Sequence, residues 1–121
     1  MVRSFGNALS LEEIEVGRDL LLVITGGTAH IGAVSTAYLK ESSPAGIEVE
    51  TSSVPGHKEH VLTETFALTC ALQLRRTVTV VMGIHFDQLQ QQELDELINE
   101  VKHELDVFLE GKKRSLSNSR E

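Results

Sequence analysis

Hydrophobic and polar residues alternate along the first half of the chain with the two-residue period of β-strands. This alternation predicts four strands, over residues 11–16, 20–25, 31–39 and 47–54. Gly17-Arg18-Asp19 is typical of a tight turn, Gly26-Gly27 closes the second strand, and residues 41–46 form a loop before the fourth. Three hairpin-like connections in succession favour an antiparallel meander.

After Pro55-Gly56-His57 the hydrophobic period changes to that of a helix. Spacings of three and four residues predict an amphipathic helix over residues 58–75, and the β-branched run 77–82 predicts a buried strand that ends at Gly83. A second helix is expected to begin at Asp87 or one of the glutamines after it and to end near Gly111. Its apolar stripe consists of Leu94, Leu97, Ile98, Val101, Leu105 and Phe108. The order ββββαβα predicts an α+β fold, a mostly antiparallel sheet with two helices packed on one face.

A chain of 121 residues is long enough for one hydrophobic core and too short for two. We therefore expect a single domain over residues 11–110, preceded by a flexible N-terminus at residues 1–10. Residues 111–121 are expected to form a disordered basic tail, because the segment from Lys112 onward holds four basic residues and a single apolar one.

The remaining body of the chain is acidic. The net charge is −7, and residues 1–110 carry seven basic and seventeen acidic side chains. Such a surface repels phosphate backbones and anionic lipids, so no nucleic-acid or membrane function is expected. The longest apolar run, Leu20 to Ile24, is far below the roughly 18 residues that span a bilayer. With no export signal at the N-terminus, a cytoplasmic location is expected.

Cys70, the only cysteine, lies in an apolar helical stretch. One cysteine excludes an intrachain disulfide, and its surroundings predict a buried, inert thiol. Two of the five histidines, His60 and His103, fall inside the predicted helices and are expected to be solvated side chains.

The other three histidines, His30, His57 and His85, each stand beside a glycine-marked turn. The strand, helix and strand from Ile47 to Met82 form a unit that normally places its two strands parallel, so His57 and His85 both follow a strand's carboxyl end. The strand that begins near His30 runs antiparallel to its partner and starts at that same end of the sheet. We therefore expect the three imidazoles to converge, together with Gly26 and Gly27.

Both predicted helices begin at this end of the sheet as well. Helix N-termini present unpaired backbone N–H groups and a partial positive charge, which favours a pocket for a phosphate or a carboxylate. Lys58 would assist, and Asp87 would fix the tautomer of His85 or act as a base.

Two other interpretations remain open from the residues alone. His30, His57 and His85 with an open fourth position would suit a catalytic zinc ion in a small metal-dependent hydrolase or lyase, although no two of them show the short spacing common in zinc sites. Alternatively, an exposed strand edge and the leucine-striped helix would mediate a homo-oligomer or another assembly.

Three segments of the chain resemble a known family: Gly26 to Val34, Val54 to Glu59 and Val80 to Asp87. The family comprises small bacterial and archaeal proteins described as prenylated-flavin chaperone-like accessory proteins of gallate and related aromatic-acid decarboxylases. Its fold is similar to that of proteasome assembly chaperones. The resemblance extends roughly from Leu11 to Leu109, and its matching positions are His30, Gly32, Pro55, Gly56, His57, Gly83, His85 and Asp87.

The resemblance implies an accessory role rather than catalysis. It implies that the protein helps a decarboxylase catalytic subunit to acquire or hold prenylated FMN, with that cofactor or FMN itself as a transient ligand. If a flavin binds, Phe86 beside His85 is the aromatic residue expected to contact its ring. On this interpretation the histidines form a binding site for the flavin phosphate.

Overall fold

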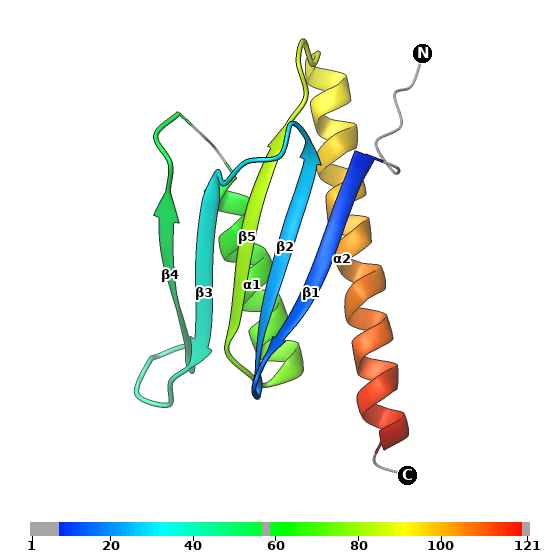
Figure 1. Cartoon of the computed structure of the whole chain (residues 1–121). Helices are drawn as coiled ribbons and strands as arrows, with labels where there is room; N and C mark the ends of the chain where they lie inside the picture. Colours follow the sequence, from blue (N-terminus) through cyan, green and yellow to red (C-terminus); the bar gives the residue numbers. More distant parts are fainter. Residues whose placement is uncertain (1–7, 57–58, 120–121) are drawn as a thin grey trace.

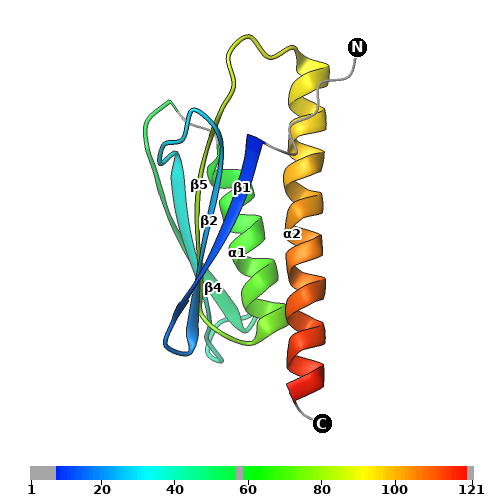
Figure 2. The same cartoon turned by 45° about the vertical axis from the view of Figure 1, so that its right-hand side comes forward.

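The computed structural model of the chain describes residues 8–56 and 59–119. The elements follow one another as β1 (Leu9–Val16), β2 (Asp19–Gly27), β3 (Ala33–Leu39), β4 (Ile47–Ser53), α1 (His60–Leu74), β5 (Val78–His85) and α2 (Gln91–Ser119). Both helices cover the same face of a single twisted sheet, and no helix of the described residues lies on the opposite face (Figures 1 and 2). The predicted α+β order and two-layer arrangement are confirmed.

The five strands lie in the order β1-β2-β5-β3-β4. β2 and β5 pair in parallel, whereas the pairs β1/β2, β5/β3 and β3/β4 are antiparallel. The predicted meander is therefore wrong, because β5 separates β2 from β3. Val78, Val80 and Met82 of β5 are fully buried, and a strand with that burial needs hydrogen-bonded neighbours on both sides.

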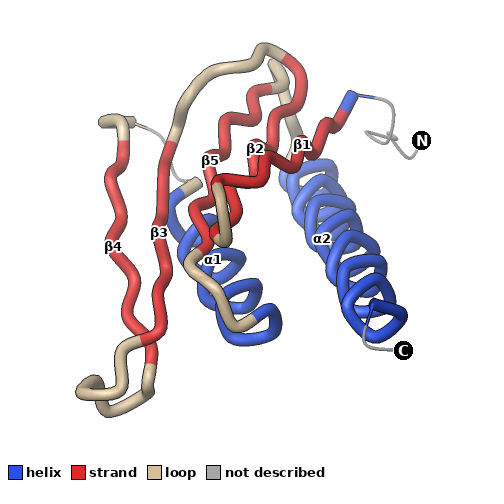
Figure 3. The backbone as a smooth tube through the Cα atoms, turned by 60° about the horizontal axis from the view of Figure 1, so that its bottom comes forward, coloured by secondary structure: helices blue, strands red, loops and turns tan. Residues whose placement is uncertain are grey.

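The core lies between the sheet and the helices. Leu20, Leu22 and Ile24 alternate along β2 with less buried residues, as expected of a strand that faces helices on one side only. Helix α1 faces the sheet with Phe66 and with two small residues, Ala67 and Ala71, which let its backbone approach closely. Figure 3 shows the two helices side by side beneath the strands.

Hydrogen bonds between three hydroxyl groups connect β3 with β4 and with α1. Ser35 of β3 lies 2.8 Å from Thr51 of β4 and 2.7 Å from Thr63 of α1, measured between the hydroxyl oxygens. Ser35 and Thr63 are fully buried, so these hydrogen bonds satisfy groups that would otherwise be costly to remove from water.

Helix α2 extends further than the sequence pattern predicts. It passes through Gly111, so the predicted end at that glycine is wrong, and residues 111–119 of the expected disordered tail are helical. Burial of Leu109 and ion pairs from Lys112 to Glu13 and Glu15 of β1 hold this part of the helix against the sheet.

At the other terminus, β1 includes Leu9 and Ser10, which were expected to belong to a flexible segment. Residues 1–7 of that segment lie outside the described part of the chain. Within residues 8–56 and 59–119, no helix combines the length and the apolar content of a bilayer-spanning segment.

Candidate functional site

Three segments that are distant in sequence meet at the upper end of the sheet in Figure 1. β2 and β5 end there, β3 begins there, and α1 starts beneath them. The backbone N–H of Gly32 donates to the carbonyl of Met82 at 2.9 Å, and the N–H of Val54 donates to the carbonyl of Gly32 at 2.9 Å. The loop that carries His30 is therefore held between β5 and the end of β4.

This arrangement places two of the three predicted histidines side by side. The ring centroids of His30 and His85 are 6.4 Å apart, with their planes at 77°. His85 is the last residue of β5, which continues past Gly83, so the predicted strand end at that glycine is wrong. His57 and Lys58, also predicted for the site, lie outside the described residues.

The His30 imidazole contacts an acceptor through each of its nitrogens. Nδ1 lies 3.1 Å from the carbonyl oxygen of Thr28, and Nε2 lies 3.0 Å from Oε2 of Glu59. A carbonyl oxygen only accepts, so Nδ1 carries a proton and donates it. The contact between Nε2 and the Glu59 carboxylate is an ion pair only when His30 is protonated.

Glu59 is the residue that the sequence-based prediction of the site missed. It occupies the N-cap position of α1 without capping the helix through its side chain. Its Oε2 instead accepts the N–H of Ile84 at 3.3 Å as well as the His30 contact. The signal was an acidic residue directly beside the predicted start of a helix, but such residues are commonly interpreted as helix caps.

A second imidazole and carboxylate pair is more exposed. Nε2 of His85 lies 2.9 Å from Oδ1 of Asp87, as expected of a residue that fixes the histidine's orientation. The side chains of His85 and Asp87 are 54% and 86% exposed, against 22% and 13% for His30 and Glu59. His85 is therefore the histidine that an incoming ligand reaches without displacing buried groups.

The glycines at this end allow backbones and side chains to approach closely. A Cβ atom on Gly83 would collide with the backbone of His30, and one on Gly32 would collide with the Glu59 carboxylate. Gly27 has a positive φ of 64°, and a Cβ atom there would collide with the backbone of His85. These three glycines set the spacing of the histidines through packing.

The other predicted glycines are less constrained. A Cβ atom on Gly26 would meet the flexible end of the Leu9 side chain and lie 3.4 Å from the Phe86 ring. Phe86 thus packs against the end of β2. Gly56 has a φ of 87° in open surroundings, which identifies it as a turn residue.

An apolar cavity of about 300 Å³ adjoins the His30–Glu59 pair between α1, β5 and α2. Glu59 forms part of its wall, and the rest is lined by Leu62, Met82, Ile84, Leu94, Leu97, Ile98 and Val101. A volume near 300 Å³ is at the lower end of the range for small-molecule pockets, and a single polar group beside apolar walls is typical of them.

Among the described residues, no group of three or more His, Cys, Asp or Glu side chains could hold a metal ion. The alternative set of His30, His57 and His85 includes a residue outside that part of the chain and stays a prediction. His60 was expected to be solvated, which is wrong, because its Nδ1 is buried and has no hydrogen-bond partner within the described structure.

Cys70 is fully buried in α1. Burial raises the pKa of its thiol to about 12, so the thiolate that would act as a nucleophile is scarce at neutral pH. The predicted burial of the thiol is confirmed, and its inertness stays a prediction.

Comparison with known proteins shows which family the chain resembles. The family model described as the prenylated flavin chaperone LpdD-like domain matches residues 4–113. Protein LpdD of Lactiplantibacillus plantarum is 31% identical over 80 residues, which cover 65% of this chain and 58% of the relative. The chain therefore aligns with less than two thirds of that relative's length.

Proposed function

The chain belongs to the prenylated flavin chaperone LpdD-like family, and from this premise we propose that it is an accessory protein of a prenylated-flavin-dependent aromatic-acid decarboxylase. In this role it assists the catalytic subunit with its cofactor and does not carry out the decarboxylation. The family match is the observation that carries the proposal, because it spans every strand of the sheet and all three motifs at its upper end. A cytoplasmic location and a homo-oligomeric state stay predictions.

We further propose that the histidine-lined end binds the flavin phosphate. Support comes from the 6.4 Å separation of the His30 and His85 rings, which lets one phosphate contact His85 and, by displacing Glu59, His30 as well. The N-terminus of α1 lies at the same end and contributes a partial positive charge. In an otherwise acidic chain, this combination tolerates a negative ligand.

The apolar cavity beside Glu59 supports a ligand with two chemically different ends. Its walls of Leu62, Met82 and Ile84 suit an apolar group such as the prenyl-bearing portion of a flavin, while a phosphate would lie toward the histidines. One molecule of prenylated FMN carries both kinds of group.

Glu59 gives the proposed site a means of release. Its Oε2 already lies 3.0 Å from Nε2 of His30, so a phosphate must compete with it for the same nitrogen. An internal competitor lowers the affinity for an anion, and moderate affinity is what a protein needs if it passes a cofactor on.

The role is tested by producing an aromatic-acid decarboxylase with and without this chain. The cofactor content of the purified enzyme, measured by its absorbance and by mass spectrometry, is expected to rise when the chain is present. A His30→Gln/His85→Ala double variant is expected to lose that effect, whereas His103→Ala, a substitution on the exposed side of α2, is expected to retain it. Equal cofactor content in all samples would contradict the accessory role.

A further inference from the structure

A second cavity, with polar walls, lies at the opposite end of the sheet from the histidines. It has a volume of about 300 Å³ and is lined by Arg18, Asp19, Leu39, Arg75, Arg76 and Thr77. Three of the seven basic residues in positions 1–110 are gathered here, against a single carboxylate in the lining. In an acidic chain this arginine pocket, as we call these six residues, is a local concentration of positive charge.

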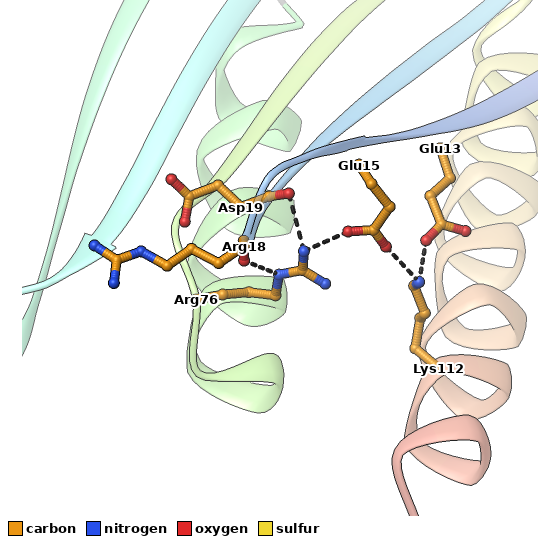
Figure 4. Close-up of polar contacts among 6 residues, drawn as sticks. All are labelled: Glu13, Glu15, Arg18, Asp19, Arg76 and Lys112. Atoms are coloured by element: carbon orange, nitrogen blue, oxygen red, sulfur yellow. Dashed lines mark hydrogen bonds and ion pairs between the residues drawn. The ribbon is translucent and has the colours of Figure 1, made fainter. Parts of the chain in front are cut away.

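Arg76 builds the wall of the arginine pocket. Its Nε donates to the carbonyl of Arg18 at 2.8 Å, and one of its terminal nitrogens donates to the carbonyl of Asp19 at 2.9 Å (Figure 4). The same nitrogen pairs with the Glu15 carboxylate. Arg76 thus fixes the turn between β1 and β2, and thereby the position from which Arg18 extends.

The other two guanidinium groups of the pocket, those of Arg18 and Arg75, are available to bind a ligand. Within the described part of the chain, the side chains of Arg18 and Arg75 make no hydrogen bond or ion pair, and both residues are exposed. In Figure 4 the Arg18 guanidinium points away from the contacts of Arg76 and of Lys112. Each can therefore donate to a ligand without breaking an existing contact.

The backbone at Arg75 gives independent support for a role of its side chain. Arg75 ends α1 in the left-handed conformation, with φ 56° and ψ 48°, and its N–H donates to the carbonyl of Ala71. Glycine is the residue that adopts this helix-terminating conformation at least cost. An arginine at this position costs more backbone energy than a glycine would. The same position makes Arg75 part of the lining of the pocket.

We propose that the arginine pocket binds a small phosphate-bearing ligand, with Arg18 and Arg75 as the groups that donate to the phosphate. The planar guanidinium matches the oxygens of a phosphate in bidentate geometry, and Leu39 gives the pocket an apolar wall for the organic part. The pocket lies at the far end of the sheet from His30 and His85, so the inference does not depend on the proposed flavin site.

Nuclear magnetic resonance of the full chain labelled with ¹⁵N tests the proposal, with inorganic phosphate and FMN as separate probes. We expect saturable shifts of the backbone amides at residues 18–20 and 75–78. Tighter binding of FMN than of inorganic phosphate at these amides shows that the ligand is a phosphate monoester, and equal binding shows that it is free phosphate. No saturable shift at these amides with either probe overturns the proposal.

Two variants in the arginine pocket and one control variant on α2 test which residues bind the phosphate. Arg75→Gly removes the charge while suiting the left-handed backbone, and Arg18→Ala removes the second guanidinium from an exposed turn. Each is expected to weaken phosphate binding about tenfold. Lys102→Ala removes the same charge from the exposed surface of α2 and is expected to change affinity less than about twofold. Equal losses in all three variants overturn the proposal.

FMN shifts confined to Thr28, Gly32 and Ile84 would refute the arginine pocket as an FMN site and support the flavin site at the histidines. Shifts confined to residues 18–20 and 75–78 would support the arginine pocket and contradict that flavin site.

Discussion

Nε2 of His30 lies 3.0 Å from Oε2 of Glu59, and both side chains are largely withdrawn from solvent. The pair joins the loop after β2 to the start of α1 across 29 residues of sequence. It also places a negative charge where the proposed ligand would place its phosphate. The properties of the candidate site therefore depend on Glu59 as much as on the histidines.

Replacing Glu59 with glutamine is expected to tighten FMN binding. Glu59→Gln keeps an oxygen that accepts from His30 and from the Ile84 N–H but removes the charge that competes with a phosphate. Loss of one nearby repulsive charge predicts an affinity gain on the order of tenfold at low ionic strength, measured by quenching of flavin fluorescence.

The matched control is Glu110→Gln, which makes the same charge change on the exposed surface of α2. It is expected to leave FMN affinity within about twofold. Unchanged or weaker binding by Glu59→Gln would show that the carboxylate does not compete with the ligand.

Gly83→Ala is expected to destabilise the fold strongly. The added Cβ would collide with the backbone of His30, and neither β5 nor the His30 loop can move without losing hydrogen bonds. We expect a loss of about 3 kcal/mol or more in the free energy of unfolding, measured with urea.

Gly111→Ala makes the same substitution at a position that has room for the added Cβ atom. Gly111 lies within α2, and a Cβ there meets nothing within 4 Å, so alanine is expected to stabilise the helix by about 0.5–1 kcal/mol. If both variants are equally stable, the close approach of Gly83 to His30 is incorrect.

The contacts of Glu15 predict a dependence of stability on pH. Side-chain hydrogen bonds from Arg76 and then from Lys112 lower the pKa of Glu15 from 4.5 to about 2. Because the pKa is lower in the folded state, the ionised Glu15 carboxylate stabilises the fold fully above about pH 5. This stabilisation is lost as the pH falls toward 2.

Glu15→Gln cannot titrate and serves as the reference. The difference in thermal unfolding midpoint between the two proteins is expected to shrink as the pH falls from 5 to 2. A difference that stays constant over this range contradicts the assigned contacts.

Cys70 is expected to resist thiol reagents in the folded protein. With a pKa of about 12, roughly one thiol in ten thousand is ionised at pH 8, and the side chain is fully buried. Labelling with an aromatic disulfide is therefore expected only after urea is added. Rapid labelling in native buffer would show that α1 is less tightly packed than described.

Local patterns were sufficient to predict the elements and the two-layer arrangement. The alternation in β2 and the helical spacing after His57 are properties of neighbouring residues, and they were interpreted correctly. The position of β5 between β2 and β3 was not predicted, because pairing partners depend on contacts between distant segments. Similarly, Gly111 resembles a helix end in sequence, but the Lys112 ion pairs with β1 favour continuation.

The candidate site was predicted only in part for the same reason. The strand, helix and strand unit placed His85, and the antiparallel pairing of the strand after His30 placed that residue, at one end of the sheet. The role of Glu59 depends on a side chain that contacts a loop 29 residues away, and an acidic residue beside a predicted helix start indicates a helix cap rather than that contact. Gly83 was expected to end a strand, although its function is to admit the backbone of His30.

Parallel titrations of FMN and riboflavin test the central claim most directly, because the two molecules differ only in the phosphate. The wild-type chain is expected to bind FMN at least about tenfold more tightly than riboflavin. His85→Ala is expected to abolish that preference, while His103→Ala on the exposed face of α2 retains it. Equal affinity for the two flavins, or a preference that survives His85→Ala, would contradict a phosphate site at the histidine-lined end of the sheet.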